Sequence, residues 1–227
     1  MTTLKLAPVL LHTAAAAILA YAWFELDHLP NNAFVEKQKG GHFQFLTIQG
    51  LVAAWVTMAL SFLADLFPSV EVIRKAKRAV FMIAMPLAAV ISTIYWGLLL
   101  FMPHLILRAP EQGEWQPNVP TDDVPDLMRV PIKLDLALHA VPGTALIMDF
   151  FLFEVKYSKK TARYGGALVA LLATVWYSCW VEYCASHNGI FPYPFLTFNP
   201  FPTRAAIYGA AGAFAYLVFQ ALNWVHT

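Results

Sequence analysis

Charged residues are scarce in this sequence. Asp, Glu, Lys and Arg make up 13% of the 227 residues, whereas about 25% is usual for a soluble globular domain. Hydrophobic residues make up 59%, and the formal net charge is only +1. A near-zero net charge offers no electrostatic footprint for a nucleic acid. The composition therefore argues against a soluble domain and against a nucleic-acid partner.

Cysteine and metal-ligand spacings are equally sparse. The two cysteines, Cys179 and Cys184, fall five residues apart within one expected helix, where their side chains point in different directions. We therefore expect two free thiols rather than a disulfide. The sequence has no closely spaced ligand pair of the H-E-x-x-H kind, which disfavours a metal centre, and we expect no cofactor.

What the sequence does have is long apolar runs. Each run is close to the ~20 residues that a helix needs to cross a bilayer. A sixth candidate, residues 134–154, is interrupted by Asp135 and Asp149. The pattern predicts an all-α polytopic membrane protein with six transmembrane helices in a single domain, 1–227. The five uninterrupted runs are residues 6–24, 40–64, 79–107, 164–181 and 205–227.

Basic residues between these runs predict the topology. Positive charges concentrate in cytosolic segments, especially in short connections. The N-terminus and the second and fourth connections hold nine Lys and Arg residues, and the other three connections hold six. Both termini should therefore be cytosolic. The third connection, about 102–132, contains six prolines, so we expect short interfacial pieces there rather than one helix.

The helix directions then predict one shallow polar layer on the non-cytosolic side. At 1.5 Å per residue, Thr47 and His139 lie a short way into their spans, and three further polar residues fall at the same level. The ionisable residues at the cytosolic ends are interpreted as ordinary boundary charges, and the remaining histidines as surface or interfacial residues. The further residues of the polar layer are His104, Glu182 and His187. The cytosolic boundary charges are Asp65, Asp149 and Glu154, and the remaining histidines are His12, His28, His42 and His226.

Thr47 and His139 each admit two interpretations. Thr47 could bond the carbonyl of Phe43 four residues back, or its hydroxyl could act as a nucleophile if a base lies beside it. His139 could tie two helices together by a hydrogen bond, or it could be a functional intramembrane group. Pro142 leaves the carbonyl of Leu138 without its usual donor, which should disturb the helix next to the histidine.

The other candidates are supporting groups. Glu182, His187 and Asn188 could orient His139, stabilise an oxyanion or, with His139, hold a metal. Ser92 is more typical of contacts between helices than of catalysis. Trp96 and its neighbour Tyr95 should pack or line a pocket.

Four segments resemble the androgen-induced gene family, which includes the androgen-dependent TFPI-regulating protein. The match covers nearly the whole chain, and its segments occur in the family's order and spacing. In that family the nucleophilic threonine follows an aromatic-Leu pair, as Thr47 does here, and the catalytic histidine corresponds to His139. The four segments are "FLTIQGL", "ISTIYWGLLL", "LDLALHAV" and "HNGIFPYPFL".

This resemblance implies a six-span membrane hydrolase that cleaves fatty acid esters of hydroxy fatty acids. Thr47 would then attack the ester carbonyl and His139 would take its proton. The expected partners are a lipid ester substrate and the surrounding membrane lipids, and the sequence leaves the oligomeric state open. The resemblance points to the endoplasmic reticulum, with the plasma membrane as the alternative. The competing function is a non-catalytic lipid-binding or lipid-carrying membrane protein that uses the same cavity.

Overall fold

The computed structural model describes residues 6–107 and 129–226, and in these residues it has helices and no strand. Short 3-10 helices follow α1, precede α3 and follow α4, at Glu25–His28, Gly41–Gln44 and Pro103–Leu105, and a π-helix at Thr161–Gly165 precedes α7. The α-helices are α1 Leu6–Phe24, α2 Asn32–Glu36, α3 Leu46–Leu66, α4 Glu71–Phe101, α5 Ile132–His139, α6 Val141–Phe153, α7 Gly166–Asn188, α8 Pro194–Thr197 and α9 Phe201–Val225.

Six segments of the described chain can cross a membrane, which confirms the predicted polytopic helical fold. Five are continuous long helices, and the sixth is the pair α5 and α6, bent by 41° at the break between them. The bend lies at Ala140, two residues before Pro142. Because proline has no N–H to bond the carbonyl of Leu138, the weak sixth span of the sequence becomes two helical pieces.

The span boundaries differ from the sequence prediction mainly in α4. This helix begins at Glu71 rather than at 79, so four basic residues expected in the connection lie within its first turns. The exposed ones can keep their charged ends outside the apolar layer while their stems cover apolar surface, whereas Lys77 is buried and paired with acidic groups. The interfacial pieces expected in the third connection fall mostly at 108–128, outside the described residues. The four basic residues are Arg74, Lys75, Lys77 and Arg78.

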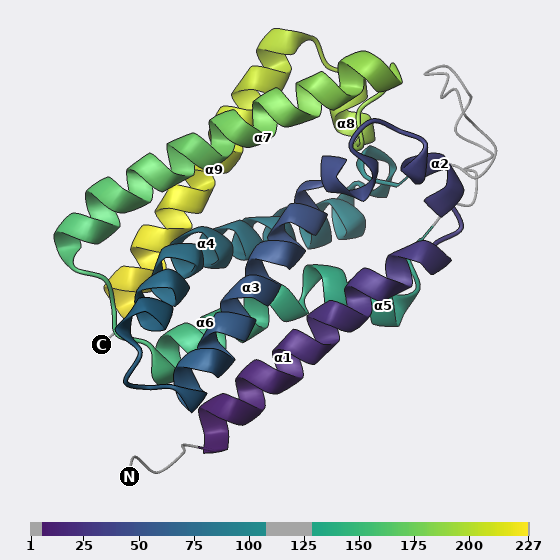
Figure 1. Ribbon diagram of the computed structural model, residues 1–227. Coiled ribbons are helices and arrows are strands. Elements are labelled where there is room, and N and C mark those ends of the chain that lie inside the picture. The colour runs from purple at the N-terminus through teal and green to yellow at the C-terminus, as the bar shows by residue number, and fades with distance from the viewer. Residues whose placement is uncertain (1–5, 108–128, 227) are drawn as a thin grey trace.

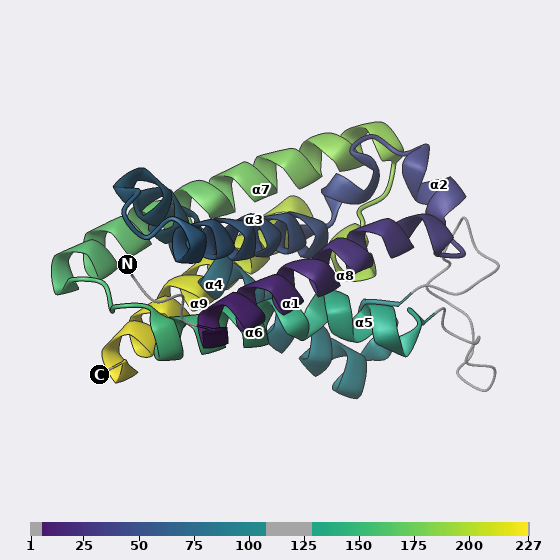
Figure 2. The ribbon, with the colours of Figure 1, turned by 60° about the horizontal axis from the view of Figure 1, so that its bottom comes forward.

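The helices form two parts that meet along α4. In the first part α1, α3, α4 and α6 pack closely around large buried side chains such as Phe81, Phe150 and Met58. In the second part α7 and α9 pair with each other and approach the first part through α4 (Figures 1 and 2). The N- and C-terminal ends of the described chain lie at one end of the bundle, and α2 and α8 at the other. We call these the terminal end and the α2–α8 end.

Charged residues at the terminal end form a buried network, which corrects the expectation of ordinary boundary charges. His12 is 1% exposed; its Nδ1 lies 2.6 Å from Asp65 Oδ2 and its Nε2 lies 3.0 Å from Asp149 Oδ1. The second contact has ion-pair distance but not hydrogen-bond geometry. Lys77 Nζ lies 3.1 Å from Asp149 and 2.8 Å from Glu154. These groups come from four helices, α1, α3, α4 and α6, with Glu154 directly after α6, so they neutralise one another inside the bundle.

Two of the four histidines expected at the surface are also buried. Besides His12, His226 is 8% exposed, and its Nε2 lies 2.8 Å from the carbonyl of Phe150. The expectation was wrong because α1 and the chain after α9 pack against α6 at the terminal end. His28 is exposed, as expected.

Candidate active site

Thr47 and His139 meet at the α2–α8 end. Thr47 is the second residue of α3 and His139 the last residue of α5. The Thr47 Oγ1 lies 3.5 Å from His139 Nε2, although the two residues belong to different spans. A pair of this kind is often longer in a free protein than in its complex with substrate. The structure thus brings together the two residues that the sequence singled out.

Asp135 completes this arrangement on the other side of the imidazole. Its Oδ1 lies 2.8 Å from His139 Nδ1, and both side chains are only 7% exposed. Because Nδ1–H donates to the carboxylate, Nε2 is left as an acceptor for the Thr47 hydroxyl. In the sequence, Asp135 stands out only as a charge that interrupts a predicted span. The D-x-x-x-H spacing, four residues apart on one helix face, was the signal that could have found it.

Helix α4 holds the imidazole from the side. The ring of Tyr95 stacks on His139 with centroids 3.4 Å apart and planes 2° apart. The Ser92 hydroxyl donates to the His139 carbonyl, so this candidate ties α4 to the end of α5 rather than facing a reacting group. Trp96 packs edge-on against Tyr95 and lines neither of the cavities described below.

A glycine turn sets the start of α3. Gly40 and Gly41 have φ angles of 87° and 47°, which residues other than glycine rarely adopt. A Cβ at Gly40 would also come within 2.7 Å of the Cys184 sulfur in α7. The indole of Trp180 donates to the Phe43 carbonyl at 2.9 Å, so the turn is fastened to α7 just before Thr47. The two cysteines are free.

Tyr193, immediately before α8, covers the start of α3. The Leu46 N–H donates to the Tyr193 hydroxyl oxygen at 3.0 Å, and the ring of Tyr193 packs edge-on against Phe45. Burial raises the pKa of Tyr193, so the hydroxyl keeps its proton and can donate it. Tyr193 lies in one of the segments that carry the family resemblance, but no role follows from the sequence, because a proline-rich loop has no periodicity from which to place a side chain.

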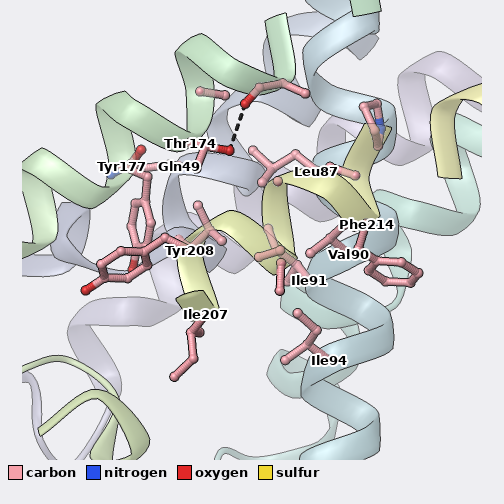
Figure 3. A pocket seen from close by; sticks show the side chains of 18 of the residues that line it. Gln49, Leu87, Val90, Ile91, Ile94, Thr174, Tyr177, Ile207, Tyr208 and Phe214 are labelled. Atoms are coloured by element: carbon pink, nitrogen blue, oxygen red, sulfur yellow. Dashed lines mark hydrogen bonds between the residues drawn. The ribbon is translucent and has the colours of Figure 1, made fainter. Parts of the chain in front are cut away.

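A large apolar cavity begins beside Thr47. It has a volume of about 840 Å³ and is lined by residues of α3, α4, α7 and α9. Figure 3 shows part of it, with labelled lining side chains from α4, such as Leu87 and Ile91, and from α9, such as Ile207. Its lining contains no Asp, Glu, Lys, Arg or His among the described residues. Pockets of 300–1,000 Å³ hold small organic ligands, and this lining suits a lipid chain. We call it the first cavity.

A second cavity of about 430 Å³ lies on the other side of Thr47, at the α2–α8 end. It is lined by His139 and by polar residues as well as apolar ones. The two cavities share four lining residues, so Thr47 stands on the boundary between them. The shared residues are Thr47, Tyr95, Ile106 and Tyr193.

The structure places three sequence candidates away from this pair. Glu182 forms a two-point ion pair with Arg204, at 2.7 and 2.8 Å, and accepts a hydrogen bond from Tyr208. His187 is exposed and bonds the backbone of its own helix, and Asn188 bonds the backbone of Lys39. None of the three lines either cavity.

The same placement bears on the metal alternative. His187 lies at the exposed end of α7, whereas His139 is buried in α5. In the described part of the chain, no group of three or more His, Cys, Asp or Glu residues is arranged to hold a metal ion.

Comparison with known proteins gives the family. The chain is 26% identical to a UPF0641 membrane protein of Schizosaccharomyces pombe over 218 residues, and this matched region covers 96% of the chain and 89% of the relative. It is 24% identical to a UPF0641 membrane protein of Saccharomyces cerevisiae, over 80% of this chain and 76% of the relative. No solved structure matches. The FAR-17a/AIG1-like protein family matches residues 7–227, which confirms the resemblance to the androgen-induced gene family. This chain belongs to the FAR-17a/AIG1-like protein family.

Proposed function

We propose that this protein is an intramembrane carboxylic ester hydrolase with Thr47 as nucleophile and His139 as base. The observation that carries the proposal is the row Asp135–His139–Thr47, with contacts of 2.8 and 3.5 Å, at the mouth of an apolar cavity. A nucleophile, a base and a group that orients the base are the parts of an acyl-transfer site.

The first half of the reaction transfers the acyl group to Thr47. His139 Nε2 takes the hydroxyl proton as Thr47 Oγ1 attacks the ester carbonyl. When the tetrahedral intermediate collapses, the carbon–oxygen bond to the alcohol breaks and His139 returns the proton to the departing alcohol. Threonine is a weak nucleophile, and the orientation of the imidazole by Asp135 and Tyr95 offsets part of this weakness by holding the reacting atoms in line.

Two donors near Thr47 suit the negative charge on the carbonyl oxygen. One is the protonated hydroxyl of Tyr193, and the other is the backbone N–H of Thr47 itself, in the first turn of α3. Donors fixed in advance at the developing oxyanion stabilise the transition state more than the substrate. These groups replace Glu182, His187 and Asn188 as our oxyanion candidates.

The second half of the reaction releases the acid. His139 removes a proton from water, the resulting hydroxide attacks the acyl-threonine carbonyl, and the proton returns to Thr47 as the ester bond breaks. The net change is the addition of one water to one ester, which gives one acid and one alcohol. A site near the end of the bundle suits this step because water must reach the acyl group.

The substrates we propose are fatty acid esters of hydroxy fatty acids, as the family resemblance implies. The uncharged first cavity of about 840 Å³ accommodates a long acyl chain, and its position among the spans allows entry from the bilayer. We retain the cytosolic placement of both termini, and residence in the endoplasmic reticulum, as parts of this proposal.

The test is hydrolysis and covalent labelling by purified protein in detergent. Thr47→Ala should abolish hydrolysis of a long-chain ester and abolish labelling by a fluorophosphonate probe. His139→Ala should abolish hydrolysis and slow labelling. Thr57→Ala is the matched control: Thr57 lies in the same helix, bonds the Ala53 carbonyl and lines neither cavity, so it should leave turnover unchanged.

The same variants separate the enzyme from the lipid-carrier alternative. A carrier would bind a lipid ester at the same place without consuming it, so Thr47→Ala would then change affinity while no product forms with any variant. Near-normal turnover by Thr47→Ala would contradict the proposed nucleophile.

A further inference from the structure

The two candidate catalytic side chains differ in the cavities they face. Thr47 lines both cavities, whereas His139 lines the second cavity only. The nucleophile is therefore open to both sides, but its base is open to one. This difference gives the site a direction that neither residue alone would provide.

The proton transfers of ester hydrolysis then decide which part of the substrate lies in which cavity. His139 has to pass its proton to the departing alcohol oxygen and later take a proton from the attacking water. Both of these oxygens must reach His139 Nε2, so both approach from the second cavity. The acyl chain, which stays bonded to Thr47 between the two steps, then occupies the opposite side.

On this basis, and resting on the hydrolase function proposed above, we infer that the two parts of the ester bind on opposite sides of Thr47. The acyl chain lies in the first cavity, and the alcohol part lies in the second cavity with an acidic group toward Arg129. After the first step the alcohol leaves through the second cavity, and water enters by the same route.

The linings match this assignment. The first cavity has no charged lining residue among those described, and the α9 part of its wall includes three alanines, Ala210, Ala211 and Ala215, between larger residues such as Ile207 and Phe214. The three alanines leave room for a hydrocarbon chain beside this stretch of the helix. A bulkier side chain on this wall would shorten the available space without touching Thr47.

The second cavity instead presents polar side chains. Asn31, Gln38 and His42 line it, and Arg129 is its one permanently charged lining residue in the part of the chain that the structure describes. Burial lowers the pKa of His42, so that imidazole is neutral at pH 7. A guanidinium with no carboxylate among the described lining residues favours an acidic group on the bound alcohol.

The experiment measures kcat/KM for a matched set of esters. One pair has the same hydroxy acid esterified with a long or a short acyl chain. A second pair has the acid group of the alcohol part either free or capped as a primary amide. Ala211→Trp narrows the first cavity, and Arg129→Gln removes the charge from the second.

We expect Ala211→Trp to lower kcat/KM for the long acyl ester by roughly tenfold or more relative to the short one, without changing the preference for the free acid. We expect Arg129→Gln to lower kcat/KM for the free acid by roughly tenfold or more relative to the amide, without changing the preference for acyl length. The matched controls are Ala213→Trp and Lys133→Gln, which are exposed and line neither cavity.

If Ala211→Trp selects against a long alcohol part instead of a long acyl part, the orientation is the reverse of the one inferred. If Arg129→Gln affects the free acid and the amide equally, the acidic group does not bind there. Thr47→Ala is measured in parallel to separate these results from failure of the proposed function. If Thr47→Ala loses all hydrolysis while Ala211→Trp or Arg129→Gln shows a reversed or absent preference, the hydrolase function stands and only the inferred placement of the two ester parts is overturned.

Discussion

Asp135 and His139 lie one helical turn apart at the end of α5, with Asp135 Oδ1 2.8 Å from His139 Nδ1. The helix breaks immediately after this pair, so the imidazole is fixed by its own helix on one edge and by Tyr95 on its face. The orientation of the proposed base therefore depends on one short helical piece.

Asp135→Asn tests this dependence. An amide can donate its own proton to Nδ1, which would leave the N–H of the imidazole pointing at Thr47 and remove the acceptor that the mechanism needs. We expect kcat to fall by about 10²–10⁴-fold with little change in KM or in the melting temperature. Steady-state kinetics and thermal unfolding measure these quantities, and a fall in melting temperature that matches the fall in activity would assign Asp135 a structural role only.

Tyr193→Phe tests the proposed oxyanion donor. The substitution keeps the aromatic packing against Phe45 but removes the hydroxyl, so it should weaken stabilisation of the transition state rather than binding of the substrate. We expect kcat to decrease by about 10²–10³-fold, the range seen when one oxyanion donor is removed, with KM nearly unchanged. Phe195, stacked on Tyr193, provides the control, since Phe195→Leu alters packing there without removing a donor. Equal losses in the two variants would argue against the donor role.

Asp149→Asn tests the buried network at the terminal end. Asp149 is 0% exposed and contacts Lys77 and His12, so its removal leaves buried charge unpaired. Losing one partner of a buried pair destabilises a protein by about 3–5 kcal/mol. The control is Glu71→Gln, which breaks the exposed pair with Lys75 and should cost about 0–1 kcal/mol. Denaturation in detergent compares the two, and similar small losses would show that the network contributes little.

His42 should make stability depend on pH. It lies outside the spans, its Nε2 is 2.6 Å from Asn32 Oδ1, and burial holds its pKa below the usual value, against the pull of Asp27 and Glu36. Protonation thus favours the unfolded chain, and stability declines as pH falls below about 6.5. The loss of melting temperature between about pH 7.5 and pH 5.5 should be smaller in His42→Gln than in the wild type. His28→Gln, at an exposed position, should behave as the wild type; equal losses in all three proteins would contradict the assignment.

The spans could be predicted because apolar run length is a quantity that a sequence contains, whereas depth only allowed Thr47 and His139 to meet and the family resemblance paired them. Apolar run length gives the spans, and the distance of each residue from the start of its span gives its depth. Two residues at equal depth can meet, and these two do. Pro142 indicated a disturbed helix between α5 and α6, since a missing backbone N–H is a local property of the chain.

The partners of these residues could not be predicted in the same way. Glu182 seemed available for the site, but Arg204 on another helix holds it, and no sequence pattern reveals which helices are neighbours. Asp65 and Asp149 looked like separate boundary charges for the same reason. Asp135 was the exception, because its partner lies on the same helix, where spacing alone shows that two side chains share a face.

The position of His12 between Asp65 and Asp149 has a consequence for how the protein enters the membrane. The three residues belong to the first, second and fourth spans, so His12 Nδ1 can meet Asp65 as soon as α3 is present, whereas its Nε2 meets Asp149 only after α6 has been synthesised. Ionisable residues in a span are costly to transfer into lipid on their own. The polar contacts of the earliest span are therefore completed only when a much later span packs against it.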